Sequence, residues 1–175
     1  MEDLRKNAIN YGMYLGLILI AFNTIIYAVD INLFTNMWVG ILTMIIMVSV
    51  AVFTTVKHKN KLGGFLSFKE AFSSFIITVI VGSLISVIYT IVLFNFIDPE
   101  AKTILTENLI KYTTGLMEKF GAKPADINEA VKEMSKTDSY GIYGQLKGYV
   151  SSIVIYSIIG LITALIIKRD RPQSL

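Results

Sequence analysis

The chain has 175 residues, of which 54% are hydrophobic, and its 16 Lys and Arg against 13 Asp and Glu give a formal net charge of +3. This length fits one domain, and the hydrophobic share exceeds what a soluble core needs. The absence of Cys excludes disulfides, thiolate metal sites and cysteine nucleophiles, and a single histidine, His58, excludes a histidine-rich metal site. Because the basic residues bracket apolar blocks, we expect a membrane protein with no nucleic-acid partner.

Four apolar blocks set the predicted architecture. Each is long enough for a membrane-spanning helix, which takes about 20 mostly apolar residues, and none shows the alternation of barrel strands. We predict an all-α fold, an integral membrane four-helix bundle that forms a single domain over residues 1–175. The first block is longer than the core of a cleaved signal peptide, so it is expected to stay as an anchor. The predicted transmembrane helices cover residues 8–29, 37–56, 71–97 and 148–167.

Basic residues near the ends of the blocks predict the orientation. Cytoplasmic loops are enriched in Lys and Arg, and the short first loop, residues 30–36, carries neither. We therefore expect both termini and a loop over residues 57–70 in the cytoplasm, and a long insertion over residues 98–145 outside. The basic residues used are Arg5, Lys6, Lys57, Lys59, Lys61, Lys69, Lys168, Arg169 and Arg171.

The predicted cytoplasmic loop leads into the third helix. Ser67 and Glu70 have the spacing of a capping box, which predicts a helix start at Ser67. His58 lies among lysines, which indicates a solvated loop attracted to anionic lipids. Aromatic residues recur there at steps of three and four, a pattern that favours a packing seam or interfacial anchor over a ligand-binding face. They are Phe65, Phe68, Phe72 and Phe75.

The insertion between the third and fourth blocks is predicted to be an extracytoplasmic helical hairpin. Asp98-Pro99 indicates a helix stop, and a second capping box, Asp126 with Glu129, indicates a helix after a turn near Gly121. The apolar stripe of this hairpin must face its partner helix, the membrane surface or another protein, and the sequence leaves these open. On the first helix the stripe consists of Leu105, Leu109, Tyr112, Leu116 and Phe120.

Polar residues inside the blocks indicate packing rather than chemistry. Asn23 and several Ser and Thr are expected to form hydrogen bonds between helices, each worth about 0.6 kcal/mol. Asp30 and Asp98 lie at outer helix ends, where caps are favoured over a cation site. Small residues four apart, such as Gly12 with Gly16, indicate close helix packing within the chain or between copies.

No sequence motif indicates an enzyme. The chain lacks the glycine-rich phosphate-binding patterns and a nucleophile turn near His58. We therefore predict no catalytic, cofactor-binding or metal-binding residue, and no cofactor. A lipid-modifying enzyme that uses Asp30, Asp98 and Glu100 is the least favoured alternative.

The stretch from Gly63 through Phe65, Ser67 and Glu70 to Phe72, together with the four spans and the helical insertion, resembles the bacterial membrane family catalogued as domain of unknown function 4199 (DUF4199). The resemblance covers nearly the whole chain. It implies a bacterial cytoplasmic-membrane location and supplies no site residues, because the family has no established activity.

These features lead to two hypotheses about function. The first is a non-enzymatic accessory or interaction protein that sits in the lipid bilayer and binds a protein partner through the extracytoplasmic helices. The alternative is a small transporter or channel subunit that forms its pathway as a homo-oligomer, using polar positions such as Ser83, Ser86 and Thr90.

Overall fold

The computed structural model describes residues 2–170, so Arg171, one of the residues used to predict the orientation, lies outside them. Within this range the secondary structure is helical, apart from one isolated bridge between Leu66 and Arg169. The elements are α1 Glu2–Val29, η1 Ile31–Thr35, α2 Met37–Lys61, α3 Phe68–Val92, η2 Leu93–Ile97, α4 Ala101–Lys119, α5 Pro124–Lys136 and α6 Ile142–Ile167.

Four of these helices are long and apolar enough to cross a membrane: α1, α2, α3 with its continuation η2, and α6. The predicted all-helical class and the four candidate spans are thus confirmed. The helices run past the apolar blocks, since α1 begins at Glu2 and α2 ends at Lys61. Lys and Glu are good helix formers, so the helices continue where the apolar composition stops. The connection between α2 and α3 therefore covers only residues 62–67.

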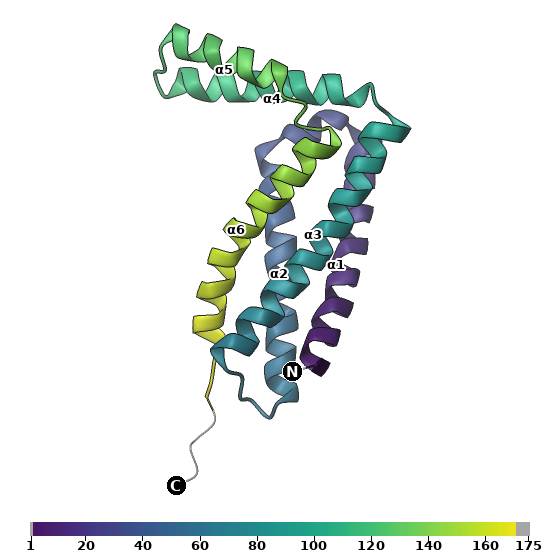
Figure 1. The fold of residues 1–175 in the computed structure, drawn as a ribbon, viewed down its shortest axis with the longest axis vertical. Helices are drawn as coiled ribbons and strands as arrows, with labels where there is room; N and C mark the ends of the chain where they lie inside the picture. Colours follow the sequence, from purple (N-terminus) through teal and green to yellow (C-terminus); the bar gives the residue numbers. More distant parts are fainter. Residues whose placement is uncertain (1, 171–175) are drawn as a thin grey trace.

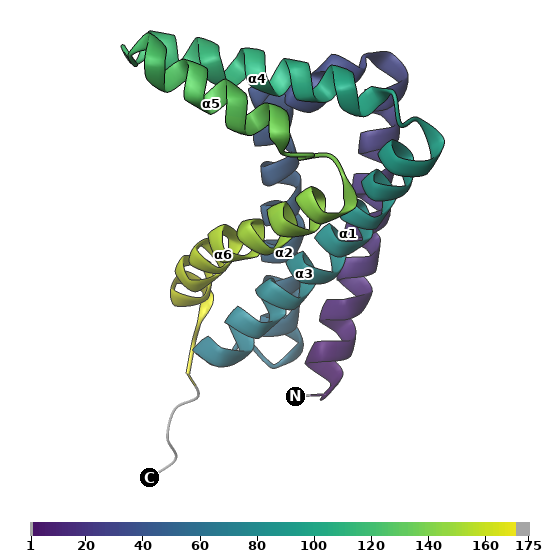
Figure 2. The ribbon, with the colours of Figure 1, turned by 45° about the horizontal axis from the view of Figure 1, so that its top comes forward.

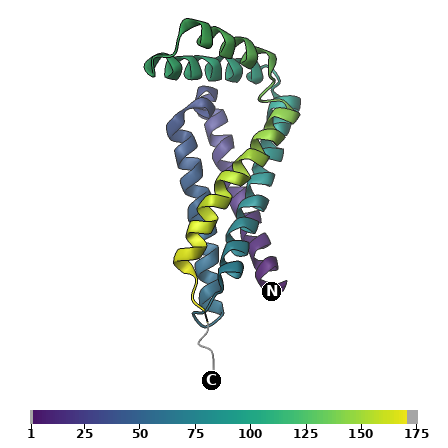
Figure 3. The same ribbon diagram turned by 60° about the vertical axis from the view of Figure 1, so that its left-hand side comes forward.

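Helix α3 lies at the centre of the long helices and packs against α1, α2 and α6 (Figure 1 and Figure 3). Its central turns contribute Phe75 and Val79 to the main core, and both are fully buried. The neighbouring helices complete this core with Leu15, Leu19, Met47 and Ala51. Close packing of these side chains, rather than a hydrophobic driving force, holds helices together in lipid.

The connection between α2 and α3 is fastened to the end of α6. Gly63 and Gly64 adopt φ angles of 71° and 88°, a left-handed region that favours glycine. The next turn pairs Leu66 with Arg169: the Leu66 N–H donates to the Arg169 carbonyl at 2.9 Å, and the Arg169 N–H donates back at 2.8 Å. These features lie at the end of the molecule that carries the start of α1, which we call the N-terminal end (Figure 1).

The predicted capping box at the start of α3 is confirmed. The Ser67 N–H donates to Glu70 Oε2 at 2.9 Å, and the Glu70 N–H donates to Ser67 Oγ at 3.3 Å. Both bonds satisfy backbone donors that a helix start otherwise leaves unpaired.

Replacing Ser67 by alanine should lower the free energy of unfolding by about 1 kcal/mol, because the cap of α3 is lost. Ser135→Ala is the matched control, since the Ser135 hydroxyl is exposed and donates only to its own helix, at the Val131 carbonyl. Thermal unfolding in detergent, followed by circular dichroism, measures both. Equal melting temperatures for the two variants would show that the capping box does not stabilise α3.

Helices α4 and α5 pack on each other and lie crosswise over the other end of the long helices (Figure 1 and Figure 2). The Asp98-Pro99 stop is confirmed, because η2 ends at Ile97 and the Ala101 N–H donates to Asp98 Oδ1 at 3.2 Å. The chain reverses at Gly121, whose φ is 74°. We call the pair α4 and α5, residues 101–136, the crosswise pair.

The predicted capping box at Asp126 is wrong. Helix α5 begins at Pro124, with Lys123 as the N-cap and no side-chain capping bond. Proline fixes the helical φ angle and needs no N–H partner at the first helical position, so it starts the helix before Asp126.

Candidate functional site

Some of the polar side chains predicted to join helices do so along the half of α3 nearer to the crosswise pair. Asn23 Nδ2 donates to Ser86 Oγ at 3.0 Å, between α1 and α3. Thr90 Oγ1 donates to Gln145 Oε1 at 2.6 Å, between α3 and α6. Ser83, the third polar position of the transporter hypothesis, donates to the Val79 carbonyl of its own helix at 2.6 Å. All three hydroxyls of that hypothesis therefore have partners within one chain.

The carboxylates of Asp30 and Asp98 act as caps. Asp30 Oδ1 accepts from the Asn32 N–H at 2.9 Å, at the start of η1. Asp98 Oδ2 accepts from the Tyr27 hydroxyl at 2.8 Å, besides its bond to the start of α4. Each carboxylate thus has a local structural role at a helix end, as the sequence indicated.

Small residues on α1 bring it close to α3. A Cβ added to Gly12 would lie 2.6 Å from the Val81 Cβ, and one added to Gly16 would lie 2.7 Å from the Ile85 Cβ. By contrast, nothing lies within 4 Å of the corresponding position at Gly148 on α6. The spacing of Gly12 and Gly16 is therefore explained by packing within one chain.

The aromatic stripe forms a packing seam towards α6. Phe68 and Phe72 stack with ring centroids 6.4 Å apart, and both pack on the buried pair Ala71 and Ala164. Phe75 is buried, and its Cδ1 lies 2.8 Å from the position of a Cβ added to Gly160. These contacts match the packing interpretation of the stripe.

The prediction that His58 lies in a solvated loop is wrong. The residue belongs to the last turns of α2 and is fully buried. Its Nδ1 lies 2.6 Å from Ser74 Oγ on α3, while its Nε2 has no hydrogen-bond partner among the described residues. A buried polar atom without a partner is uncommon in proteins and calls for an explanation.

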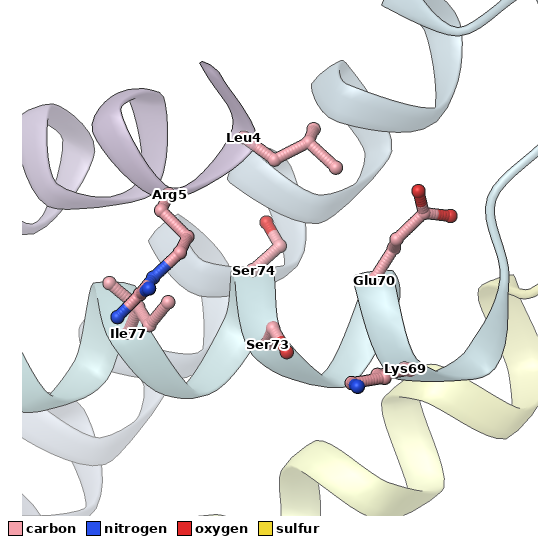
Figure 4. A pocket seen from close by; sticks show the side chains of 7 residues that line it. All are labelled: Leu4, Arg5, Lys69, Glu70, Ser73, Ser74 and Ile77. Carbon is pink, nitrogen blue, oxygen red and sulfur yellow. The ribbon is translucent and has the colours of Figure 1, made fainter. Parts of the chain in front are cut away.

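A pocket of about 270 Å³ opens beside Ser74, the partner of His58, at the N-terminal end between the first turns of α1 and α3. The Arg5 side chain extends from α1 towards α3 (Figure 4). Ser73 and Ser74 of α3 lie between it and Lys69 and Glu70, which belong to the first turn of α3. The lining residues are Leu4, Arg5, Lys69, Glu70, Ser73, Ser74 and Ile77.

The charge of this pocket is set by two cations and one tethered carboxylate. Neither Arg5 nor Lys69 forms an ion pair within residues 2–170, where both ion pairs lie in or beside the crosswise pair. Glu70 is held by the Ser67 N–H and hydroxyl, at 2.9 and 2.7 Å. Sequence reasoning used Arg5 and Lys69 only for orientation and did not identify the pocket.

The apolar stripe of the crosswise pair is covered only in part within the described residues. The apolar side chains of α5, such as Ile127 and Val131, are half-buried in the packing of α5 on α4, although no residue of α5 is fully buried. On α4, Leu105 is buried at the base beside Phe94, but Phe120 at the far end is 87% exposed. Along α4 the stripe is therefore buried at Leu105, half-buried at Leu109 and Leu116, and exposed at Tyr112 and Phe120.

A hollow lies under α4, lined by Trp38 and Tyr112 among others. Trp38 is 72% exposed at the start of α2. Exposed Trp and Tyr of this kind prefer the headgroup level of a membrane. At the base of the crosswise pair, outside the long helices, burial raises the pKa of Tyr140.

The four long apolar helices define an α-helical protein of the multi-pass membrane class. A family model described as protein of unknown function (DUF4199) matches residues 10–169, and the chain belongs to this family. No curated protein and no solved structure matches the chain.

Proposed function

We propose that the chain is a non-enzymatic accessory protein of the bacterial cytoplasmic membrane that binds a protein partner through the crosswise pair. The observation that carries this proposal is the difference in burial along the pair. Its base is buried on η1 and η2, and its far end exposes the ring of Phe120. Exposed aromatic side chains at the centre of a docking face supply much of the binding energy of protein interfaces.

The buried base of the crosswise pair supports the idea that α4 is held in a fixed position on η2. Ala101 and Leu105 are buried against Leu93 and Phe94, and Lys102 Nζ donates to Asn95 Oδ1 at 3.2 Å and to Asp138 Oδ2 at 3.3 Å. These contacts hold the start of α4 to η2 and join the segment after α5 to α4. A surface that is already ordered loses less conformational entropy when a partner binds.

The proposed topology places the N-terminal end in the cytoplasm and the crosswise pair outside. The chain contains no native Cys, so single cysteines report their side of the membrane without background. A membrane-impermeant maleimide added to intact spheroplasts should label Asn128→Cys on α5 and leave Lys61→Cys unlabelled until the membrane is permeabilised. The reverse pattern would invert the topology, and labelling of both before permeabilisation would contradict four spans.

The partner is tested by crosslinking in the native membrane, followed by purification of the full-length chain. We expect a protein captured by the parent to be lost when residues 99–139 are replaced by a Gly/Ser linker, and also with Phe120→Ser. Phe96→Ser is the matched control, because Phe96 is 70% exposed but lies on η2, and it should keep the capture. Capture that survives the linker variant, or is lost equally with the control, would overturn the proposal.

The alternative function, a small oligomeric transporter or channel subunit, requires more than one copy. In this alternative, α6 is the helix that contacts the other copies, because side chains such as Val154, Ile158 and Ile162 on it are more than half exposed. Counting subunits by single-molecule photobleaching in nanodiscs measures this. A monomer would remove the alternative, and a stable oligomer would favour it.

A further inference from the structure

We propose that the pocket between α1 and α3 at the N-terminal end binds a phosphate ester anion, either the headgroup of an anionic phospholipid or a soluble phosphate compound. This inference concerns the end of the molecule opposite the crosswise pair and does not depend on the proposed partner. It rests on the cations of the pocket, its hydroxyls, its depth in the membrane and the unusual pairing of His58.

The cations supply the attraction. Arg5 and Lys69 reach the pocket from two different helices, and neither is neutralised by an ion pair within the described residues. Arginine presents a planar set of donors that matches phosphate oxygens, while lysine acts as a compact positive charge. The carboxylate on the wall, Glu70, is engaged by the capping bonds with Ser67, and its charge is balanced there by N–H and O–H donors.

The hydroxyls supply short hydrogen bonds. Ser73 and Ser74 both line the pocket, and Ser74 is 2% exposed. The Ser74 oxygen is 2.6 Å from His58 Nδ1. A serine hydroxyl has one proton to donate. If His58 Nδ1 carries no proton, Ser74 donates to it; if Nδ1 is protonated, Ser74 accepts from it and can donate elsewhere.

The unpartnered Nε2 of His58 indicates which tautomer is present. A buried N–H without an acceptor is rarer in proteins than a buried acceptor without a donor. Nε2 has no partner, so it is the acceptor nitrogen, and the ring proton is on Nδ1. His58 then donates to Ser74, and the Ser74 proton is free to be donated into the pocket. The buried histidine thereby positions Ser74 as a donor for an anion.

The depth of the pocket matches the phosphate layer of a bilayer. A helix rises about 1.5 Å per residue, and half of a hydrocarbon core is about 15 Å. Arg5 precedes the middle of the apolar block over residues 8–29 by about 13 residues, which places its Cα about 20 Å from the centre of that block, within the headgroup layer. Lys69, in the first turn of α3, precedes the middle of the apolar block over residues 71–97 by about 15 residues, which corresponds to about 22 Å. Both cations are therefore at the level where phospholipids carry their phosphates.

The size of the pocket selects a headgroup rather than a whole lipid. Its volume of about 270 Å³ holds a phosphate group with a few waters, since one liquid water occupies about 30 Å³. Leu4 and Ile77 form its apolar walls. The acyl chains of a lipid would extend along these walls and out over the exposed surface of the helices.

The test uses the full-length chain in detergent and native mass spectrometry. Phosphatidylglycerol is titrated against the parent and against Arg5→Gln with Lys69→Gln, and inorganic phosphate is then added as a competitor. Each cation near an anionic surface contributes about fivefold to binding, so the double variant should bind about 25-fold more weakly. Circular dichroism confirms that the variant is folded, and Arg5→Lys with Lys69→Arg, which keeps both charges but moves the planar donor set, should bind more tightly than the double Gln variant.

The control removes the same charge elsewhere at the same end. Lys6 and Lys168 are exposed and do not line the pocket, so Lys6→Gln with Lys168→Gln should bind phosphatidylglycerol as the parent does. Competition by millimolar phosphate would identify a soluble phosphate compound as the ligand, and its absence would identify a lipid headgroup; both support the site. An equal loss in the control, or equal binding of phosphatidylcholine, would overturn it.

Discussion

Replacing Phe75 by alanine should lower the free energy of unfolding by about 3 kcal/mol. The ring is fully buried among Leu15, Leu19 and Met47, and α6 approaches it through Gly160. Large-to-small changes in protein cores cost about 3–5 kcal/mol, part of it from transfer to water and part from the cavity left behind. In a membrane protein the transfer contribution shrinks, because lipid rather than water surrounds the separated helices, so the lower value applies.

Phe96→Ala is the control for this prediction, since its ring is 70% exposed and leaves no cavity. Unfolding in mixed micelles by increasing fractions of a denaturing detergent, followed by circular dichroism, gives both free energies. If Phe75→Ala and Phe96→Ala unfold at the same detergent fraction, α3 is not the packing centre of the long helices.

The four spans and most helix boundaries followed from the sequence because they depend on local signals. Apolar length predicts a membrane helix, and the Ser67 and Glu70 pair predicts the start of α3 from four adjacent residues. The prediction failed at Asp126, where two local signals competed and Pro124 decided the start of α5. Pro124 lies two residues before Asp126, and a proline in that position favours a helix start at the proline itself.

The burial of His58 was missed although the sequence carries a signal for it. Met47, Ala51, Thr54 and His58 recur at steps of four and three, the spacing of one helix face, and all four are buried. The lysines around His58 suggested a loop and concealed this periodicity. Continuing the helical stripe of the second span beyond Val56 would have placed His58 against a neighbouring helix.

The pocket at the N-terminal end could not be predicted from the sequence. Arg5 and Lys69 are far apart in the chain and meet only because α1 packs on α3. The small residues on α1 indicated a close-packing face but not which helix lies on it. Tertiary packing therefore creates this site, and single-sequence patterns carry no information about it.

The most specific stretch of the family resemblance has a structural explanation at almost every position. Gly63 and Gly64 make the turn, Leu66 pairs with Arg169, and the Arg169 guanidinium lies 5.3 Å from the centroid of the Phe65 ring. Lys69 has no such contact and instead lines the pocket. In a stretch that otherwise fastens the connection to α6, this lysine is the residue that packing and capping leave unexplained, which agrees with a ligand role.

Replacing Gly12 by alanine should lower the free energy of unfolding by about 1–3 kcal/mol, the usual cost of overpacking a close contact. The added methyl would lie 2.6 Å from the Val81 Cβ and 3.0 Å from the Thr78 carbonyl oxygen. Neither atom is the end of a flexible side chain, so α1 must move away from α3. This movement would also weaken the Asn23 bond to Ser86 further along the same pair of helices.

Gly148→Ala provides the matched control, because it makes the same change inside another long helix where nothing lies within 4 Å. There the substitution should be neutral or raise the free energy of unfolding by up to about 1 kcal/mol, since alanine favours a helix over glycine. Unfolding of both variants in mixed micelles gives the comparison. Opposite signs for the two alanines would locate the close helix contact between α1 and α3 of one chain. If Gly148→Ala is the more damaging change, α6 packs against something absent from a single chain, and the oligomeric alternative regains its support.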